Sequence, residues 1–236
     1  MGEKIGMCEN KYIASELDPL IVFADNHLLA VNKPAGWLTQ DSGTGLRNLE
    51  DWAREWVRVD KNKPGAVFLN AVHRIDKAVS GVVLFARTSK ALTRMNEEIR
   101  NRKVTKVYHV LVEGMPKKSA DKLVHWMIHE NHRARICKKG QKGAQEAVLS
   151  YRTLPKVGTF QCLEVDLETG RYHQIRAQLS AIGNPIAGDE KYGARKKTKA
   201  GDIALHSREL HISHPTRKEP LKMVAPYPTS SSWWKA

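Results

Sequence analysis

The chain has 236 residues, enough for one large domain or two small ones with a buried core. Hydrophobic residues make up 41% of it, which excludes a disordered chain, and the formal net charge of +14 favours a polyanionic partner. No apolar run approaches the roughly 18 residues of a membrane-spanning helix, so we expect nucleic acid rather than membrane as partner. The three cysteines, Cys8, Cys137 and Cys162, are widely spaced and odd in number, which favours reduced thiols and a cytoplasmic location.

The first part of the chain predicts a hairpin followed by two helices. Two apolar runs, 21–24 and 28–31, flank a short polar turn and are typical of a β-hairpin. Apolar residues at helical spacing predict an amphipathic helix over 48–58. A further helix is predicted to follow Ser89, which has the side chain of an N-cap.

The rest of the chain contains strand-like and helical patterns. Alternating or apolar runs predict strands at 105–112, 148–154, 160–167 and 203–213. Residues 116–146 are polar and strongly basic, and we expect short strands or a long projecting loop there. Ile175, Leu179 and Ile182 lie at i, i+4 and i+7, a spacing that predicts a helix ended by Gly183.

The sequence predicts a single domain. The sequence has no internal repeat and no clear linker, so we expect one domain over 19–236 that mixes strands and helices. Residues 1–18 show little periodicity and are expected to form a loose leader.

One short segment has the residues of a reactive site. Asp76 lies between two cations, Arg74 and Lys77, on a connection between two predicted apolar strands, 66–69 and 82–85. Packed strands would hold the carboxylate rigidly, and the cations favour its ionised form, so it could serve as a nucleophile or base. Taken alone, an aspartate beside an arginine is more often a structural ion pair, and that alternative stays open at this point.

The segment around Asp76 resembles a known signature. Residues 73–81 are similar to His-Arg-Leu-Asp-x-x-Thr-Ser-Gly, the catalytic signature of the RluA-type RNA pseudouridine synthases, with Ile75 in place of leucine and Val79 in place of threonine. Further motifs of that family are matched in order by Lys33-Pro34-Ala35-Gly36, by Tyr108, by Thr169-Gly170-Arg171-Tyr172-His173-Gln174-Ile175-Arg176, by Gly188-Asp189-Glu190-Lys191-Tyr192-Gly193, and by Leu205-His206 through His214-Pro215. The matches span about residues 19–220, and several in order are far more specific than one.

The resemblance implies an α+β fold, in which a mixed, mostly antiparallel sheet flanked by helices carries a cleft. It implies that Asp76 is the catalytic carboxylate, which attacks the sugar or the base, or removes a sugar proton; the sequence leaves these paths open. Arg176 would pair with Asp76. Tyr108 would stack on the extruded base, and Ile175 would pack near it. Arg74 would contact RNA and fill the gap left by the flipped uridine.

No metal, nucleotide or redox cofactor is implied. Without the resemblance, Tyr108 would be an ordinary sheet tyrosine and Arg176 a surface cation.

The implied partner is RNA, ribosomal or transfer, and the sequence does not indicate which uridine is modified. Two basic runs are expected to bind its phosphates from opposite sides of the cleft. They are Lys138, Lys139 and Lys142 in the first run, and Arg195, Lys196, Lys197 and Lys199 in the second. Many members of the family carry a separate N-terminal RNA-binding domain, and we expect none here because the catalytic hairpin starts near residue 20. We also expect a monomer.

Other interpretations have less support. His125, His129, His132 and Cys137 lie close enough in sequence to bind a metal ion, but their spacing matches no zinc finger, and solvated histidines in a basic loop are favoured. A relative that only binds RNA would also be basic, yet binding alone needs no carboxylate such as Asp76 facing the phosphates. A deaminase or a methyltransferase would need a zinc signature or a glycine-rich loop that the sequence lacks.

Overall fold

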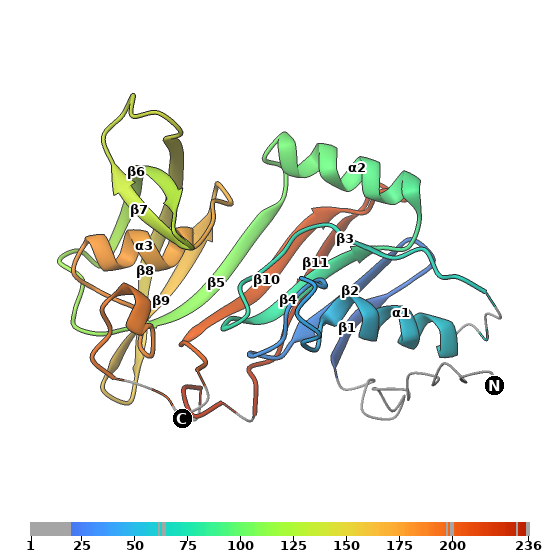
Figure 1. Cartoon of the computed structure of the whole chain (residues 1–236), viewed down its shortest axis with the longest axis horizontal. Coiled ribbons are helices and arrows are strands. Elements are labelled where there is room, and N and C mark those ends of the chain that lie inside the picture. Colours follow the sequence, from blue (N-terminus) through green and yellow to red (C-terminus); the bar gives the residue numbers. More distant parts are fainter. Residues whose placement is uncertain are drawn as a thin grey trace, which may run out of the picture.

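The computed structural model of the chain describes residues 20–60, 62, 65–196, 198, 201–229 and 231–234 (Figure 1). The leader predicted over 1–18 lies outside the described residues. The helices of the described part are α1 (Leu49–Asp60), α2 (Ser89–Arg100), α3 (Gln174–Ala181) and the short 3₁₀ turn η3 (Glu190–Tyr192). Its strands are β1 (Ile21–Ala24), β2 (Leu28–Lys33), β3 (Asn70–Ala71), β4 (Ser80–Ala86), β5 (Thr105–Val112), β6 (Ala120–Glu130), β7 (Arg133–Cys137), β8 (Gln145–Val157), β9 (Phe160–Leu167), β10 (Leu205–Ser213) and β11 (Pro220–Val224). None of these helices is long and apolar enough to cross a membrane.

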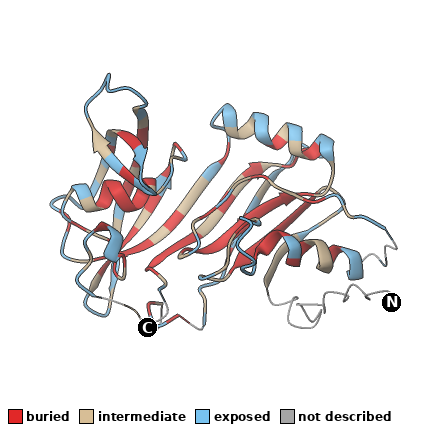
Figure 2. Ribbon diagram, in the orientation of Figure 1, coloured by how far each residue is buried: buried red, intermediate tan, exposed pale blue. Residues whose placement is uncertain are grey.

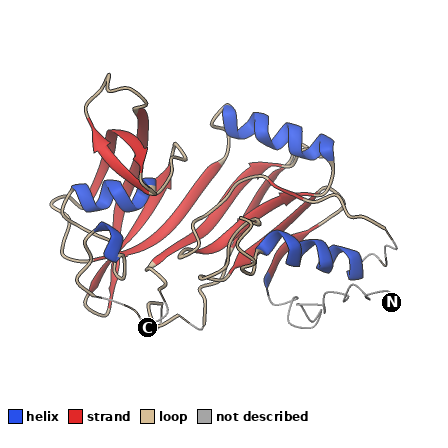
Figure 3. Cartoon of the chain, viewed as in Figure 1, coloured by secondary structure: helices blue, strands red, loops and turns tan. Residues whose placement is uncertain are grey.

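All of these strands join one sheet (Figure 3). Their order is β1-β2-β4-β10-β5-β9-β8-β6-β7, with β11 paired to β10 and β3 paired to β4. The neighbouring strands pair antiparallel, except that β10 runs parallel to β4 over a short contact. The predicted fold class is therefore confirmed: a mixed, mostly antiparallel sheet flanked by helices. Because β10 lies between β4 and β5, the segment that leads into β4 comes close to residues of β5 that are distant in the sequence.

The two strands β2 and β4 are buried along their whole length (Figure 2). Alternate residues of these strands face two different apolar clusters. One cluster includes Leu29 and Val83 together with Trp52 of α1, and the other includes Leu84 together with Met95 of α2. Since a helix covers each face, both strands are continuous apolar runs rather than alternating ones.

One predicted strand is absent. Residues 66–69 have no strand structure, and only the two residues of β3 pair with β4, with Asn70 opposite Ala86 and Ala71 opposite Phe85. Continuing this antiparallel register backwards would place 66–69 beyond the end of β4. The chain there turns into α2, so it offers no strand edge for pairing. Within this run Leu69 is buried and Val67 packs against the same apolar cluster, whereas Phe68 is exposed.

Two smaller predictions also need correction. The N-cap of α2 is Thr88 rather than Ser89, because the Thr88 side chain accepts a hydrogen bond from the backbone N–H of Ala91 at 3.1 Å. The basic segment 116–146 contains the long strand β6 and the strand β7, which pair as a hairpin, and β6 also pairs with β8. Of the two expected alternatives, strands are therefore observed and a projecting loop is not, although β6 is long rather than short; the segment is the far end of the main sheet.

Candidate active site

A cleft of about 1130 Å³ opens on the sheet, and it is strongly cationic. Its lysines and arginines come from five separate segments of the chain, and its carboxylates are few. The lining cations are Arg74, Lys77, Arg100, Arg102, Lys106, Arg171, Arg176 and Lys191, and the lining carboxylates are Asp41, Asp76 and Glu168. Such a surface favours a polyanion along the cleft.

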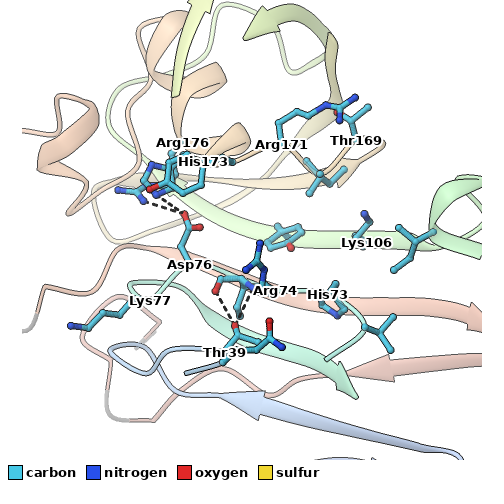
Figure 4. A pocket seen from close by; sticks show the side chains of 18 of the residues that line it. Thr39, His73, Arg74, Asp76, Lys77, Lys106, Thr169, Arg171, His173 and Arg176 are labelled. Atoms are coloured by element: carbon cyan, nitrogen blue, oxygen red, sulfur yellow. Dashed lines mark hydrogen bonds and ion pairs between the residues drawn. The ribbon is translucent and has the colours of Figure 1, made fainter. Parts of the chain in front are cut away.

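Asp76 lies in this cleft on a loop that is fixed by hydrogen bonds (Figure 4). The Thr39 hydroxyl donates to the carbonyl oxygen of Ile75 at 3.1 Å and accepts from the Ile75 N–H at 3.3 Å. The Gly36 N–H donates to the carbonyl of Lys77 at 2.8 Å. The loop connects β3 to β4, and hydrogen bonds to the segment after β2, which the sequence did not predict, fix its course.

Arg176, on α3, connects two carboxylates. Its guanidinium donates to Asp189 through Nε and Nη2, at 2.7 and 2.8 Å, and to Asp76 through Nη1 at 3.1 Å. Arg176 is 7% exposed and Asp189 is 1% exposed. Burial alone would lower the pKa of Arg176, but the two carboxylates raise it above its ordinary value, so the guanidinium stays charged and oriented toward Asp76.

His173 lies beside the same carboxylate. Its Nε2 is 3.5 Å from Oδ2 of Asp76, and its Nδ1 is 2.9 Å from the hydroxyl of Tyr192. Burial and, second to it, the Arg176 charge lower the pKa of His173 to about 3, so this imidazole is neutral at pH 7. The Tyr192 hydroxyl accepts from the N–H of Ala134 and is free to donate to Nδ1, which leaves the ring proton on Nε2, toward Asp76.

A smaller pocket of about 90 Å³ opens from the cleft, and every residue predicted to be catalytic or substrate-binding lines it. They are Arg74, Asp76, Tyr108, Ile175 and Arg176. Arg74 is exposed at this site, whereas Tyr108 and Ile175 are 6% and 5% exposed. Burial raises the pKa of the Tyr108 hydroxyl to about 12, so Tyr108 is a neutral phenol at pH 7.

The described members of the two predicted basic runs do not line the cleft. Lys139 lies over the ring of Trp126, and the neighbouring His125 contacts Gln178 of α3, so Trp126 and Lys139 are on the face of β6 away from α3. Lys196 lies over the ring of Phe160. Lys197 and Lys199 lie outside the described residues. The expected placement on opposite sides of the cleft is not observed for the described members, and RNA binding by these runs stays a prediction.

Sequence reasoning missed several residues of the site. Asp189 and His173 stood inside matched motifs, but only the fold shows that they meet Asp76 or its partner. Lys33 is 0% exposed, and its ammonium donates to the carbonyls of Pro34, Trp37 and Lys77 at 2.9, 2.7 and 3.3 Å. Burial lowers the pKa of Lys33 to about 7, and the Asp76 charge opposes that shift.

The histidine and cysteine cluster noted in the sequence does not assemble. No group of three histidine, cysteine, aspartate or glutamate side chains in the described part of the chain could hold a metal ion. The His125 ring instead contacts Gln178 at 3.0 Å, and the His129 ring packs against Tyr172 with 4.1 Å between centroids.

Solved structures define the class of this fold. The chain is similar to the human protein RNA Pseudouridylate Synthase Domain Containing 4, with a TM-score of 0.77, 24% identity, and coverage of 92% of this chain and 91% of that one. Human RNA Pseudouridylate Synthase Domain Containing 1 gives a TM-score of 0.66 at 23% identity, with 90% and 85% coverage. The fold is that of pseudouridine synthase domains.

Sequence comparison identifies the family. Residues 27–181 match the profile described as RNA pseudouridylate synthase. Ribosomal large subunit pseudouridine synthase C of Vibrio vulnificus is 32% identical, with 90% of this chain and 67% of that protein covered. Uncharacterized RNA pseudouridine synthase YlyB of Bacillus subtilis is 31% identical, with 92% and 71% covered, and tRNA pseudouridine synthase C of Pectobacterium carotovorum is 29% identical, with 87% and 58% covered. The chain belongs to the RNA pseudouridylate synthase family and is an isomerase of that class.

Proposed function

We propose that this enzyme converts specific uridines of structured RNA to pseudouridine, with Asp76 as the catalytic carboxylate. The observation that carries the proposal is the small pocket, where Asp76, Arg74, Tyr108, Ile175 and Arg176 meet. The reaction breaks the bond from the ribose to nitrogen 1 of uracil and forms one to carbon 5; carbon 5 loses its proton to water, and nitrogen 1 gains one from water. It is balanced without an oxidant or reductant, so we propose that it needs no cofactor.

The proposed role of Asp76 depends on its charge and its position. Arg176 donates a hydrogen bond to the carboxylate, and the hydrogen-bonded loop fixes its place beside the pocket. The carboxylate would attack the sugar or the base, or remove a sugar proton. His173 offers an N–H toward the same oxygen, and we propose that it helps to orient that oxygen.

The pocket would bind the uracil after the nucleotide leaves its stack, because the reacting atoms cannot be reached inside a helix. Tyr108 would stack on the base, and Ile175 with Leu205 would form an apolar wall. The exposed Arg74 would enter the space that the uridine vacates. Extrusion costs a few kcal/mol, which contacts between the cleft cations and the RNA backbone would offset.

We propose ribosomal or transfer RNA as the substrate, because the names of relatives refer to the large ribosomal subunit or to tRNA. We propose that the enzyme is a monomer. A cytoplasmic location follows from the expected reduced thiols and the RNA substrate.

Tritium release tests this function. Ribosomal RNA and transfer RNA would be transcribed in vitro with tritium at carbon 5 of uracil, the carbon that forms the new bond, and each would be incubated with the wild type and with Asp76→Ala. Release by the wild type and not by the variant is expected, and the RNA that responds identifies the substrate class. If both RNA types are bound without any release, the chain is an RNA-binding relative and the proposed function is wrong.

A further inference from the structure

The end of helix α2 contributes cations to the cleft at a distance from the proposed catalytic group. Arg100 and Arg102 line the cleft there, and Lys106 follows on β5. In Figure 4, Lys106 lies farther along the cleft than the pair formed by Asp76 and Arg176. None of these three cations lines the small pocket, so they are not needed to hold the uracil.

The backbone at the end of α2 does not favour an arginine. The N–H of Arg102 donates to the carbonyl of Ile99 at 3.1 Å, and the N–H of Lys103 donates to the carbonyl of Glu98 at 2.9 Å. This pair of bonds is a Schellman motif with Arg102 in the C′ position, and its φ is +55°. Glycine is the usual residue there, because a Cβ atom is unfavourable in the left-handed region. Helix termination therefore gives no reason for the arginine side chain.

The macrodipole of α2 does not supply that reason either. Cations near a helix C-terminus are favourable, but Arg100 and Lys103 already provide them. Within the described part of the chain, the Arg102 side chain forms no ion pair or hydrogen bond, and it lines the cleft. Its charge is thus available to a ligand in the cleft.

Lys106 is directed to the same space from the neighbouring strand. It precedes Tyr108 by two residues, so the two side chains share one face of β5. Lys106 is half-buried, and its ammonium lies near Gly170, where an added Cβ would be 3.7 Å from Nζ. Glu168, a carboxylate that lines this region, is already paired with Lys122 at 2.7 Å.

We propose that Arg100, Arg102 and Lys106 form a phosphate-binding subsite for the RNA strand that flanks the reacting uridine. The subsite rests on the proposed function, because it assumes that the strand leaves the pocket along β5 toward α2. The three cations contact the phosphates of the RNA strand and no base, so the subsite sets the affinity and register of that strand and not its sequence specificity.

The test variant is Arg102→Gly, because glycine suits the left-handed backbone at residue 102 and the variant is therefore expected to fold. Lys218→Gly is the matched control: Lys218 is an exposed cation with φ of +62° in the turn between β10 and β11, and it does not line the cleft. Both variants lose one positive charge, and both should melt at the wild-type temperature or about 2–4 °C above it. Arg102→Lys retains the charge and is the rescue variant.

The readout is the salt dependence of binding to ribosomal RNA and transfer RNA transcribed in vitro. We expect Arg102→Gly to weaken binding severalfold and to reduce the slope of log K against log salt concentration by about 0.7–0.9, with Lys218→Gly and Arg102→Lys close to wild type. In turnover, KM should rise while kcat at saturating RNA is retained.

An unchanged slope for Arg102→Gly, or an equal reduction for Lys218→Gly, would overturn the subsite. Its failure is distinguishable from failure of the proposed function. Tritium release by the wild type with an unchanged Arg102→Gly slope counts against the subsite alone. RNA binding without release counts against the proposed function, and the salt slopes still decide the subsite.

Discussion

The buried contact between Arg176 and Asp189 gives a prediction that separates stability from catalysis. In Asp189→Asn, the amide has the size of the carboxylate but no charge, and its NH₂ group faces one of the guanidinium N–H groups. Removing one partner of a buried ion pair costs about 3–5 kcal/mol. Since Arg176 keeps its 3.1 Å contact with Asp76, we expect about 3 kcal/mol, near the lower end.

The assay is thermal unfolding of the purified protein, together with tritium release from RNA. For a chain of this size, about 3 kcal/mol corresponds to a fall in Tm of about 6–12 °C. Tritium release should also fall, because the guanidinium loses the partner that orients it toward Asp76. The matched variant is Asp76→Asn, which removes the other carboxylate of the same arginine. The Asp76 side chain is 27% exposed and makes one ion pair with Arg176, so we expect about 1 kcal/mol or less.

Two outcomes would refute this reasoning. One is an Asp189→Asn protein that melts with the wild type, which would show that Asp189 does not carry the buried charge of Arg176. The other is an Asp76→Asn protein that loses as much stability as Asp189→Asn, which would make Asp76 a structural partner rather than a group reserved for chemistry.

Two further predictions concern the backbone that supports the site. Burial places the folded-state pKa of Lys33 near 7, below its ordinary 10.5, so the folded state binds fewer protons than the unfolded state between these values and stability from this group increases with pH. The free energy of unfolding of wild type minus that of Lys33→Met should therefore rise by about 2 kcal/mol from pH 7.5 to 9.5 in urea titrations, and a flat difference would contradict it. In Gly81→Ala, the new Cβ would lie 2.3 Å from the Ser207 carbonyl oxygen with φ at +117°, so we expect a loss of at least about 3 kcal/mol or no folded protein. Gly43→Ala, with φ of +73° and open space around it, is the control and should lose about 1 kcal/mol. Equal losses in the two variants would contradict the prediction that the close contact of Gly81 with Ser207 on β10 excludes a side chain.

The sequence predicted most of the local structure. The hairpin of β1 and β2, the helices α1 and α3, and the strands β5, β8, β9 and β10 follow from hydrophobic spacing and turn residues, which are local signals. It predicted 66–69 wrongly, because an apolar run shows burial but does not show whether a partner strand extends far enough to pair.

For the site, the motifs named residues that the structure places together, and the roles of these residues stay predictions. The resemblance brought together Asp76, Tyr108 and Arg176, and the structure places all three around one pocket. The contact of Asp189 with Arg176 depends on how α3 packs beside η3, which no spacing in the sequence shows. The basic runs were the obvious candidates for RNA contacts, yet the cleft is lined by isolated cations that the strand order brings together.

The measurement that tests the account most directly compares RNA binding and tritium release for wild type and Asp76→Asn, on the RNA that the wild type modifies. The asparagine keeps the shape of the side chain and removes its charge and basicity. We predict RNA affinity within about threefold of wild type, and release slower by at least about a thousandfold under single-turnover conditions. Release within tenfold of wild type, with normal binding, would show that Asp76 is not the catalytic carboxylate.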